Sequence, residues 1–291
     1  MNKKTAITVL TATILIIGYW WYALVWHMLF TEEEPLRVHF LDVGQGDAIV
    51  LETPNSHRVV IDAGRGIQVL SALDDIVSTR NRNIDVVVMT HPDEDHIGGF
   101  IPILERYTVG TILQSFAVSE SSVYKQVMEA IEKEKAGVHT IQQPRSFLLD
   151  GVQFDILWPL STEVTETNAA SVALLVTYGN TEIVLTGDAP TEIENFLIES
   201  FPEKLDDIEI LKAGHHGSKT ATTATFLQHT KPNAIVYSAG KDNPYGHPHD
   251  IVLSRVRVYA EKNPTENLTE YYTANGTVSF CITPTQFSVC N

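Results

Sequence analysis

Cysteine is scarce in this 291-residue chain: Cys281 and Cys290 are its two cysteines, and both lie near the C-terminus. Two cysteines at this spacing do not make a structural zinc motif, which needs four ligands. They fit a terminal hairpin whose turn is centred between Thr285 and Gln286, where the two would lie opposite each other. The sequence leaves a disulfide in an oxidising compartment and a pair of free thiols equally open.

Positive charge is also in short supply, since 20 lysines and arginines face 36 aspartates and glutamates, for a formal net charge of −16. Such a surface repels nucleic acid at long range, because binding to phosphates depends on clustered lysine and arginine. It does not exclude a phosphodiester substrate, since bound divalent cations can reverse the local field. The 44% hydrophobic share excludes global disorder and predicts a packed core.

One stretch lacks charge altogether: residues 5–30 contain no Asp, Glu, Lys or Arg. About 20 apolar residues span a bilayer as a helix, and the aromatic residues crowded into 19–26 are typical of a membrane interface. Lys3 and Lys4 precede the stretch and glutamates at 32–34 follow it, so the positive-inside rule places the N-terminus in the cytoplasm. We therefore expect one transmembrane helix and an extracytoplasmic domain at the cell membrane.

A cleaved signal peptide and a buried core helix are the alternatives to this anchor. A signal peptide needs small residues before its cleavage site, and the aromatic cluster offers no good Ala-x-Ala site. No linker, repeat or low-complexity tract divides the chain after residue 36, and the remaining length fits one large domain. We expect residues 1–35 to form a membrane anchor with a short linker and residues 36–291 to form one domain.

Strands and helices follow in a mixed order. The apolar run at residues 84–89 is typical of a strand buried on both faces, and Asn275-Gly276 within residues 271–280 predicts a hairpin. Early strands followed by strands that alternate with helices indicate an α/β domain with mixed sheets. The other strands are expected at residues 36–41, 48–52, 58–61, 171–178, 182–185, 207–211 and 233–237, and the helices at residues 66–79, 121–135, 191–200, 220–229 and 250–261.

The strongest chemical signal directly follows the strand at 84–89. Two histidines and two aspartates, His91, Asp93, Asp95 and His96, are interleaved there. The carboxyl end of a strand is where α/β sheets place their sites, and nitrogen and carboxylate ligands suit zinc or manganese. A polar surface turn is the alternative, but this interleaving is unusual for one. The segment predicts a two-metal site, with His91 and Asp93 facing one cation and Asp95 and His96 the other.

Four other segments complete a pattern with this one. They are Phe-Leu-Asp-Val-Gly-Gln-Gly-Asp at 40–47, Leu-Thr-Gly-Asp at 185–188, Leu-Lys-Ala-Gly-His-His-Gly-Ser at 211–218 and Tyr-Gly-His-Pro-His at 245–249. Together they resemble the metallo-β-lactamase superfamily, and most closely the extracytoplasmic hydrolase domain of the competence DNA-uptake protein ComEC. The resemblance runs from about residue 36 to 260 and implies an αββα sandwich with the site along one edge.

The resemblance also implies roles for single residues. It makes Asp188 a bridge between two cations, whereas alone Asp188 would suit the N-cap of a helix beginning near Pro190. It takes one ligand from His215 and His216. Because adjacent side chains rarely point the same way, we take His215 as the ligand and His216 as a catalytic or orienting group.

His247 and His249 are spaced to share one face of an extended segment. They would protonate a leaving group or hold a phosphate, although a solvated loop around Pro248 explains them equally well. Asp62 is expected to orient the metal-binding loop rather than bind a cation. The expected metal ligands are therefore His91, Asp93, Asp95, His96, Asp188 and His215, and the expected catalytic residues are Asp95, His216, His247 and His249.

The glycine turn at residues 44–47 has two explanations: Asp42, Gln45 and Asp47 line the edge of the site, or the glycines only serve a tight turn.

The chain lacks one feature of the superfamily that it resembles. Members with three histidine ligands supply one before the bridging aspartate, but no histidine lies between 139 and 215, where Asn168 stands instead. One metal position is then weaker or takes a harder ion such as Mn²⁺.

The expected reaction is metal-assisted hydrolysis. Two divalent cations, Zn²⁺ or Mn²⁺, lower the pKa of a water held near Asp95 and Asp188 towards ~7, and the hydroxide attacks phosphorus. The resemblance, and not the ligand set, selects a phosphodiester. The leading hypothesis is DNA cleavage outside the membrane, in uptake or scavenging, with competence proteins as possible partners.

Two other functions compete with this one. A small phosphoester, lactam or thioester would suit the same site, and the lack of a basic, aromatic-rich stripe favours such a substrate over long DNA. A membrane-anchored binding module without turnover is the third hypothesis, and the complete ligand set argues against it.

Overall fold

The computed structural model describes residues 3–30, 34–76, 81–160, 164 and 166–290. The chain forms two compact units, Met1–Glu34 and Pro35–Asn291. The first unit contains one helix, α1 (Lys3–Phe30). Among the described residues, no helix has both the length and the apolar character required to cross a membrane. The transmembrane anchor therefore stays a prediction.

The second unit is built on two sheets. The first sheet has eight strands in the order β15-β14-β1-β2-β3-β4-β5-β6, and the second has seven in the order β13-β12-β11-β10-β9-β8-β7. The first comprises β1 (Leu36–Phe40), β2 (Ala48–Glu52), β3 (Arg58–Ala63), β4 (Asn83–Met89), β5 (Thr108–Ser115), β6 (Gly137–Ile141), β14 (Val278–Thr283) and β15 (Gln286–Val289). The second comprises β7 (Arg145–Leu149), β8 (Val152–Trp158), β9 (Ala173–Tyr178), β10 (Thr181–Leu185), β11 (Ile210–Lys212), β12 (Ala234–Tyr237) and β13 (Thr269–Tyr272).

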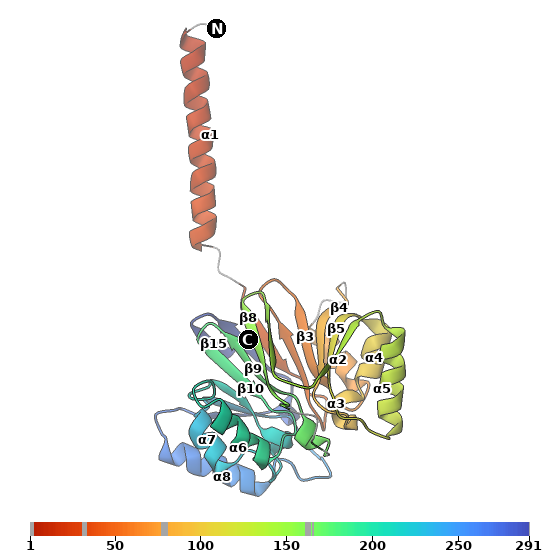
Figure 1. The fold of residues 1–291 in the computed structure, drawn as a ribbon. Helices are drawn as coiled ribbons and strands as arrows, with labels where there is room; N and C mark the ends of the chain where they lie inside the picture. The colour runs from red at the N-terminus through yellow and green to blue at the C-terminus, as the bar shows by residue number, and fades with distance from the viewer. Residues whose placement is uncertain (1–2, 31–33, 77–80, 161–163, 165, 291) are drawn as a thin grey trace. The chain divides into compact units, whose positions relative to one another are not determined.

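Helices cover the outer face of each sheet, as Figure 1 shows. The first sheet packs against α2 (Gln68–Ile76), α3 (Glu94–Ile97), α4 (Phe100–Arg106) and α5 (Ser122–Lys133). The second packs against α6 (Thr191–Ser200), α7 (Ala224–Thr230) and α8 (Asp250–Lys262). A third apolar cluster, which includes Phe40, Ile61, Phe154 and Val236, fills the space between the sheets. The expected αββα sandwich is confirmed.

The strand order brings three chain segments to one edge of the sandwich. β3 and β4 run parallel in the first sheet, and β10 and β11 run parallel in the second. The carboxyl ends of parallel strands lie at the same edge, where α/β folds place their sites. The segments that follow β4, β10 and β11 carry His91, Asp188 and His215. Three motifs far apart in sequence therefore meet there.

The predicted hairpin at Asn275-Gly276 is wrong. β13 pairs parallel with β12 in the second sheet, whereas β14 pairs antiparallel with β1 in the first. The segment between them, which contains the short 3₁₀ helix η3 (Thr273–Asn275), carries the chain from one sheet to the other. Local turn residues can predict a reversal of the chain, but they do not determine which neighbour each strand will pair with.

The terminal cysteines form a disulfide, Cys281–Cys290. Their hairpin has a different register from the expected one, because Thr283 pairs with Gln286 and Cys281 pairs with Ser288. The turn is therefore centred one residue earlier than predicted, and the cysteines lie diagonally across the two strands. Their Cα atoms are 5.1 Å apart, within the range that a disulfide bridges.

Candidate metal centre

The segment that carries His91 to His96 is held by the glycine turn at residues 44–47. The backbone of Gly46 lies so close to Asp95 that a Cβ atom there would be 2.0 Å from the Asp95 carbonyl oxygen. The Asp47 amide donates a hydrogen bond to that same oxygen, at 3.2 Å. The turn therefore serves both purposes left open by the sequence, since the approach needs glycine and Asp47 reaches the site.

Asp62, near the end of β3, orients this segment through hydrogen bonds. Its carboxylate accepts hydrogen bonds from the Thr90 amide at 2.8 Å and from the Thr90 hydroxyl at 2.6 Å. Nδ1 of His96 lies 2.7 Å from the second carboxylate oxygen. All three residues are buried, so Asp62 sets the orientation of the His96 ring and leaves Nε2 of His96 free to face the site. The expected orienting role is confirmed.

Four side chains converge closely on one point. Nε2 of His96 lies 3.2 Å from Nε2 of His216 and 3.3 Å from Oδ1 of Asp188. Nε2 of His216 lies 3.4 Å from Oδ2 of Asp188 and 3.5 Å from Oδ2 of Asp95. Ligands about 2.0–2.1 Å from a tetrahedral ion are separated by about 3.3 Å. The spacing of these donors therefore fits a single small divalent cation.

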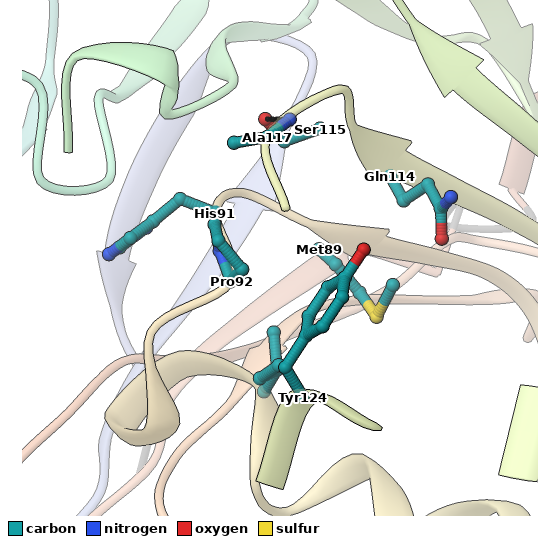
Figure 2. Close-up of a pocket in the computed structure, with 8 residues that line it drawn as sticks. Met89, His91, Pro92, Gln114, Ser115, Ala117 and Tyr124 are labelled. Atoms are coloured by element: carbon teal, nitrogen blue, oxygen red, sulfur yellow. Dashed lines mark hydrogen bonds between the residues drawn. The ribbon is translucent and has the colours of Figure 1, made fainter. Parts of the chain in front are cut away.

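A second, wider set of donors shares Asp188. Nε2 of His91 lies 3.9 Å from Oδ2 of Asp188 and 3.8 Å from Oδ2 of Asp93. Nε2 of His215 lies 3.4 Å from the same Asp188 oxygen. Asp188 thus contacts both sets, in the place that a bridging carboxylate would need. Figure 2 shows the His91 ring pointing away from the small hollow that Met89 and Tyr124 line behind it.

Buried polar atoms provide a second test of whether a cation fits. Among the described residues, Nε2 of His91 and Oδ1 of Asp188 are shielded from solvent and have no hydrogen-bond partner. Buried polar atoms normally have one, because an unsatisfied group costs about 1–3 kcal/mol. Both atoms point into the cluster, so a divalent cation would satisfy them, and the donor set fits the metal that the fold implies.

The structure favours exchanging the expected roles of His215 and His216. Both residues have positive φ angles, 49° and 57°, and their rings diverge with an interplanar angle of 75°. The His216 side chain is buried, and its Nε2 lies 3.2–3.5 Å from donor atoms of His96, Asp188 and Asp95, the close set. The His215 side chain is 24% exposed and reaches only the wider set. Only the turn geometry distinguishes two neighbours that the sequence presents as equivalent.

The sequence analysis did not predict Lys212 as a site residue. It placed Asp47 only at the edge of the site and missed its contacts within the cluster. Nζ of the fully buried Lys212 lies 2.5 Å from Oδ2 of Asp47 and 3.7 Å from Oδ1 of Asp188. Oδ1 of Asp47 forms an ion pair with Nδ1 of His216 at 3.2 Å. A lysine at the end of an apolar strand, one turn before two histidines, was the available signal.

The electric field of the cluster changes the proton affinity of its members. Burial lowers the pKa of His96, but Asp188 and Asp62 outweigh it and raise that pKa well above the usual value. His216 follows the same pattern through Asp188 and Asp47. Burial raises the pKa of Asp188, yet the two imidazoles hold it well below its usual range. In the metal-free protein, the surrounding carboxylates therefore favour the protonated form of these imidazoles.

Lys212 and His91 differ from these two histidines. Burial lowers the pKa of Lys212, but Asp47 and Asp188 together raise it above the usual value, so Lys212 remains a cation at neutral pH. Burial lowers the pKa of His91 well below the usual value, and the nearby His96 adds to the effect. His91 is therefore a neutral imidazole, the form that binds metal ions.

The cluster opens to solvent through a pocket of about 120 Å³. Of the two histidines in the 245–249 motif, His247 lines this pocket, whereas Nδ1 of His249 instead accepts a hydrogen bond from the Lys219 amide at 2.9 Å. The structure thus brings His247 to the site and uses His249 to hold a loop, so a direct catalytic role for His249 is not supported. The pocket is lined by Gln45, Asp93, Asp95, Asp188, His215, His216, Tyr245 and His247.

Known proteins share this sequence pattern. Residues 41–241 match the metallo-beta-lactamase superfamily profile. ComE operon protein 3 of Bacillus subtilis is 28% identical over 234 residues, which are 75% of this chain and 30% of that protein. Competence protein ComA of Neisseria gonorrhoeae is 32% identical over 234 residues, 79% of this chain and 31% of that protein. The chain thus spans about a third of these relatives, and the resemblance to competence proteins is confirmed.

Solved structures share the fold at much lower identity. CmlA, a diiron beta-hydroxylase from Streptomyces venezuelae, superposes with a TM-score of 0.58 at 11% identity, covering 87% of this chain and 55% of that one. The metallo-beta-lactamase fold protein YhfI from Bacillus subtilis gives 0.53 at 16% identity, covering 82% and 95%. These likenesses concern the fold alone. With its two covered sheets, its converging histidines and aspartates and its matching profile, the chain belongs to the metallo-beta-lactamase superfamily.

Proposed function

We propose that residues 36–291 form a metal-dependent phosphodiesterase that cleaves DNA. The observation that carries the metal dependence is the set of distances of 3.2–3.5 Å between the donor atoms of Asp95, His96, His216 and Asp188. The choice of DNA rests on the relatives, which include two competence proteins and Recombination protein 2 of Haemophilus influenzae.

Charge balance supports two cations at this site. Neutral histidines leave the cluster with five carboxylates and one ammonium, hence four negative charges that two divalent cations would offset. His91, Asp93, His215 and Asp188 would hold one cation, and Asp95, His96, His216 and Asp188 the other. The carboxylates are those of Asp47, Asp62, Asp93, Asp95 and Asp188, and the ammonium is that of Lys212.

The side chains of the pocket have separate tasks. Bound Zn²⁺ or Mn²⁺ would lower the pKa of a water towards ~7 and offset negative charge on the phosphate. Burial and the neighbouring His216 lower the pKa of His247 to about 4. His247 is therefore neutral at pH 7, so its N–H can hold a phosphate oxygen by a hydrogen bond. A proton donor to the leaving group must have a higher pKa than that of His247, so His247 does not suit that task.

We also propose that the domain works outside the cytoplasmic membrane, anchored by α1. The uncharged residues 5–30 and the lysines before them support this orientation. The Cys281–Cys290 disulfide supports it independently, because disulfides persist in oxidising compartments and are rare in the cytosol.

A small phosphodiester is a second candidate substrate. The pocket of about 120 Å³ is small, and the net charge of −16 opposes the approach of a long polyanion. The small ester would be hydrolysed by the same donor set, so the two candidates differ only in what surrounds the site.

The test uses the full chain, stripped of metal and then reloaded with Mn²⁺ or Zn²⁺. The expected result is nicking of plasmid DNA that disappears in His91→Ala and persists in His139→Ala, a histidine outside the pocket. Hydrolysis of bis-p-nitrophenyl phosphate without DNA cleavage would select the small substrate. Bound metal with neither reaction would favour a binding module, and a chain that binds neither cation would refute the proposal.

A further inference from the structure

Lys212 is the least expected residue in the cluster. Its side chain is fully buried, which lysine rarely is unless it is paired. Nζ lies 2.5 Å from Oδ2 of Asp47, and it donates a hydrogen bond of 3.0 Å to the Gly187 carbonyl oxygen. These contacts fix the ammonium between the turn at 44–47 and the strand end that leads to Asp188.

Asp47 could act in either of two ways. It belongs to the group of four side chains whose donor atoms lie within 4.8 Å of one another, so it could be a metal ligand. Oδ2, however, already pairs with Nζ of Lys212 at 2.5 Å, and Oδ1 lies 3.2 Å from Nδ1 of His216, an ion-pair distance without the geometry of a hydrogen bond. A carboxylate on Nδ1 orients a histidine whose Nε2 binds metal.

We propose that Lys212 is a positioning residue whose ammonium holds Asp47 against Nδ1 of His216 and keeps Asp47 from coordinating a cation. This inference rests on the proposed metal site and adds a role that the ligand set does not require. It makes His216 a ligand through Nε2 and Asp47 the residue that orients its ring, so Asp47 itself is not a ligand.

The neighbouring histidine shows the same arrangement with a different partner. Asp62 faces Nδ1 of His96, and it also accepts hydrogen bonds from the amide and the hydroxyl of Thr90. Lys212 thus holds the carboxylate of Asp47 in place, as Thr90 holds the carboxylate of Asp62. In both pairs a second group holds the carboxylate that lies beside Nδ1 of the histidine, and Nε2 of that histidine faces the other donors.

A buried lysine could instead serve only the stability of the fold. The two roles differ in what happens to the metal when the ammonium is removed. Lys212→Met preserves the length and apolar stem of the side chain but releases Oδ2 of Asp47. A positioning role predicts that the released carboxylate then turns to the cation as an additional ligand, whereas a structural role leaves the coordination unchanged.

Cobalt substitution makes this difference visible. Co²⁺ is loaded into the metal-stripped full chain, and the visible absorption of the bound ion is recorded for wild type, Lys212→Met and the double variant Lys212→Met/Asp47→Asn. Visible bands of Co²⁺ weaken as coordination number rises. We expect weaker bands in Lys212→Met and wild-type intensity in the double variant, because its amide is a poor ligand. Equal spectra in all three proteins would overturn the proposal.

Asp47→Asn keeps the question answerable if Lys212→Met does not fold. Loss of an orienting residue weakens metal binding by about 10–100-fold without changing the number of ions bound. We expect this result from Co²⁺ titration followed by metal analysis. Loss of one bound ion per chain would identify Asp47 as a ligand and refute the role of Lys212. If wild type itself binds no Co²⁺, Zn²⁺ or Mn²⁺, the proposed function fails first.

Discussion

Asp188 is the residue on which the two donor sets depend. Its carboxylate lies within 3.3–3.9 Å of ring nitrogens from His96, His216, His215 and His91. Its amide donates a hydrogen bond to the Ser171 hydroxyl, which fixes the backbone just after β10. The N-cap role that this aspartate might have had is absent from the described structure, since α6 begins after Pro190 without a side-chain cap.

The two adjacent histidines should respond differently to truncation. We expect His216→Ala to lose most of the cation bound by the close set, because its Nε2 contacts Asp95, His96 and Asp188. His215→Ala should retain that ion and bind the second one more weakly. Metal analysis after dialysis distinguishes the two variants. The reverse order of loss would restore His215 as the main ligand.

Metal-free protein should lose stability as pH rises above neutrality. His96 and His216 have folded-state pKa values well above 6.5, so their contribution is full below pH 6.5 and is lost as pH rises through the folded values. Cations compete with these protons, so metal affinity should increase over the same range. Thermal unfolding from pH 6 to 9, with and without Zn²⁺, measures both trends. A melting temperature of the metal-free chain that does not fall would contradict the assignment of these pKa shifts.

At the scale of elements, the turn between β1 and β2 is the one that builds the site. Gly44 and Gly46 both have positive φ angles, 76° and 124°. A Cβ atom at Gly44 would meet open space, whereas one at Gly46 would collide with the Asp95 backbone. The first glycine therefore serves only the turn, and the second also serves the contact with the metal-binding segment.

These two glycines provide a matched pair of variants. Gly44→Ala should cost about 1 kcal/mol, the strain of a left-handed residue. Gly46→Ala should cost a further ~1–3 kcal/mol, because the added methyl group forces the Asp95 segment to move. Urea unfolding gives the two stabilities, and Gly46→Ala should also weaken metal binding. Equal losses in both variants would show that the contact with Asp95 is not important.

The terminal hairpin of β14 and β15 is a second element whose stability can be tested. The disulfide closes a short loop, and a loop of this size stabilises the folded state by about 2–3 kcal/mol through the entropy of the unfolded chain. We expect the Cys281→Ser/Cys290→Ser variant to unfold at correspondingly lower denaturant concentration, with its metal content unchanged. Reduction of the wild-type protein by dithiothreitol should reproduce the effect. No change in either experiment would mean that the disulfide does not contribute.

At the scale of the whole molecule, the sandwich separates stability from chemistry. Three apolar clusters fill the spaces between and outside the sheets, and the charged cluster is confined to one edge. The same fold carries the hydroxylase chemistry of CmlA. The identity of the donors and the walls of the pocket therefore decide the reaction. The net charge of −16 opposes the approach of phosphate groups, and bound divalent cations would reverse the field locally.

Several features followed from the sequence alone. The apolar run at 84–89 identified β4, and the interleaved histidines and aspartates after it predicted side chains that the structure brings close to Asp188. The hydrogen bonds of Asp62 agree with its expected orienting role, and the αββα architecture followed from the resemblance to the metallo-β-lactamase superfamily. The strand and the donor cluster could be predicted from the residues themselves because apolar runs and ligand spacing act within a few residues of one another.

Tertiary structure decided the rest. The pairing of the strands around Asn275-Gly276, the choice between His215 and His216, and the meeting of Lys212 with Asp47 all depend on segments far apart in the chain. Side-chain direction after a left-handed turn depends on two backbone angles that residue type does not specify. The contact between Lys212 and Asp47 exists only because two sheets bring their strand ends to the same edge, which no local pattern encodes.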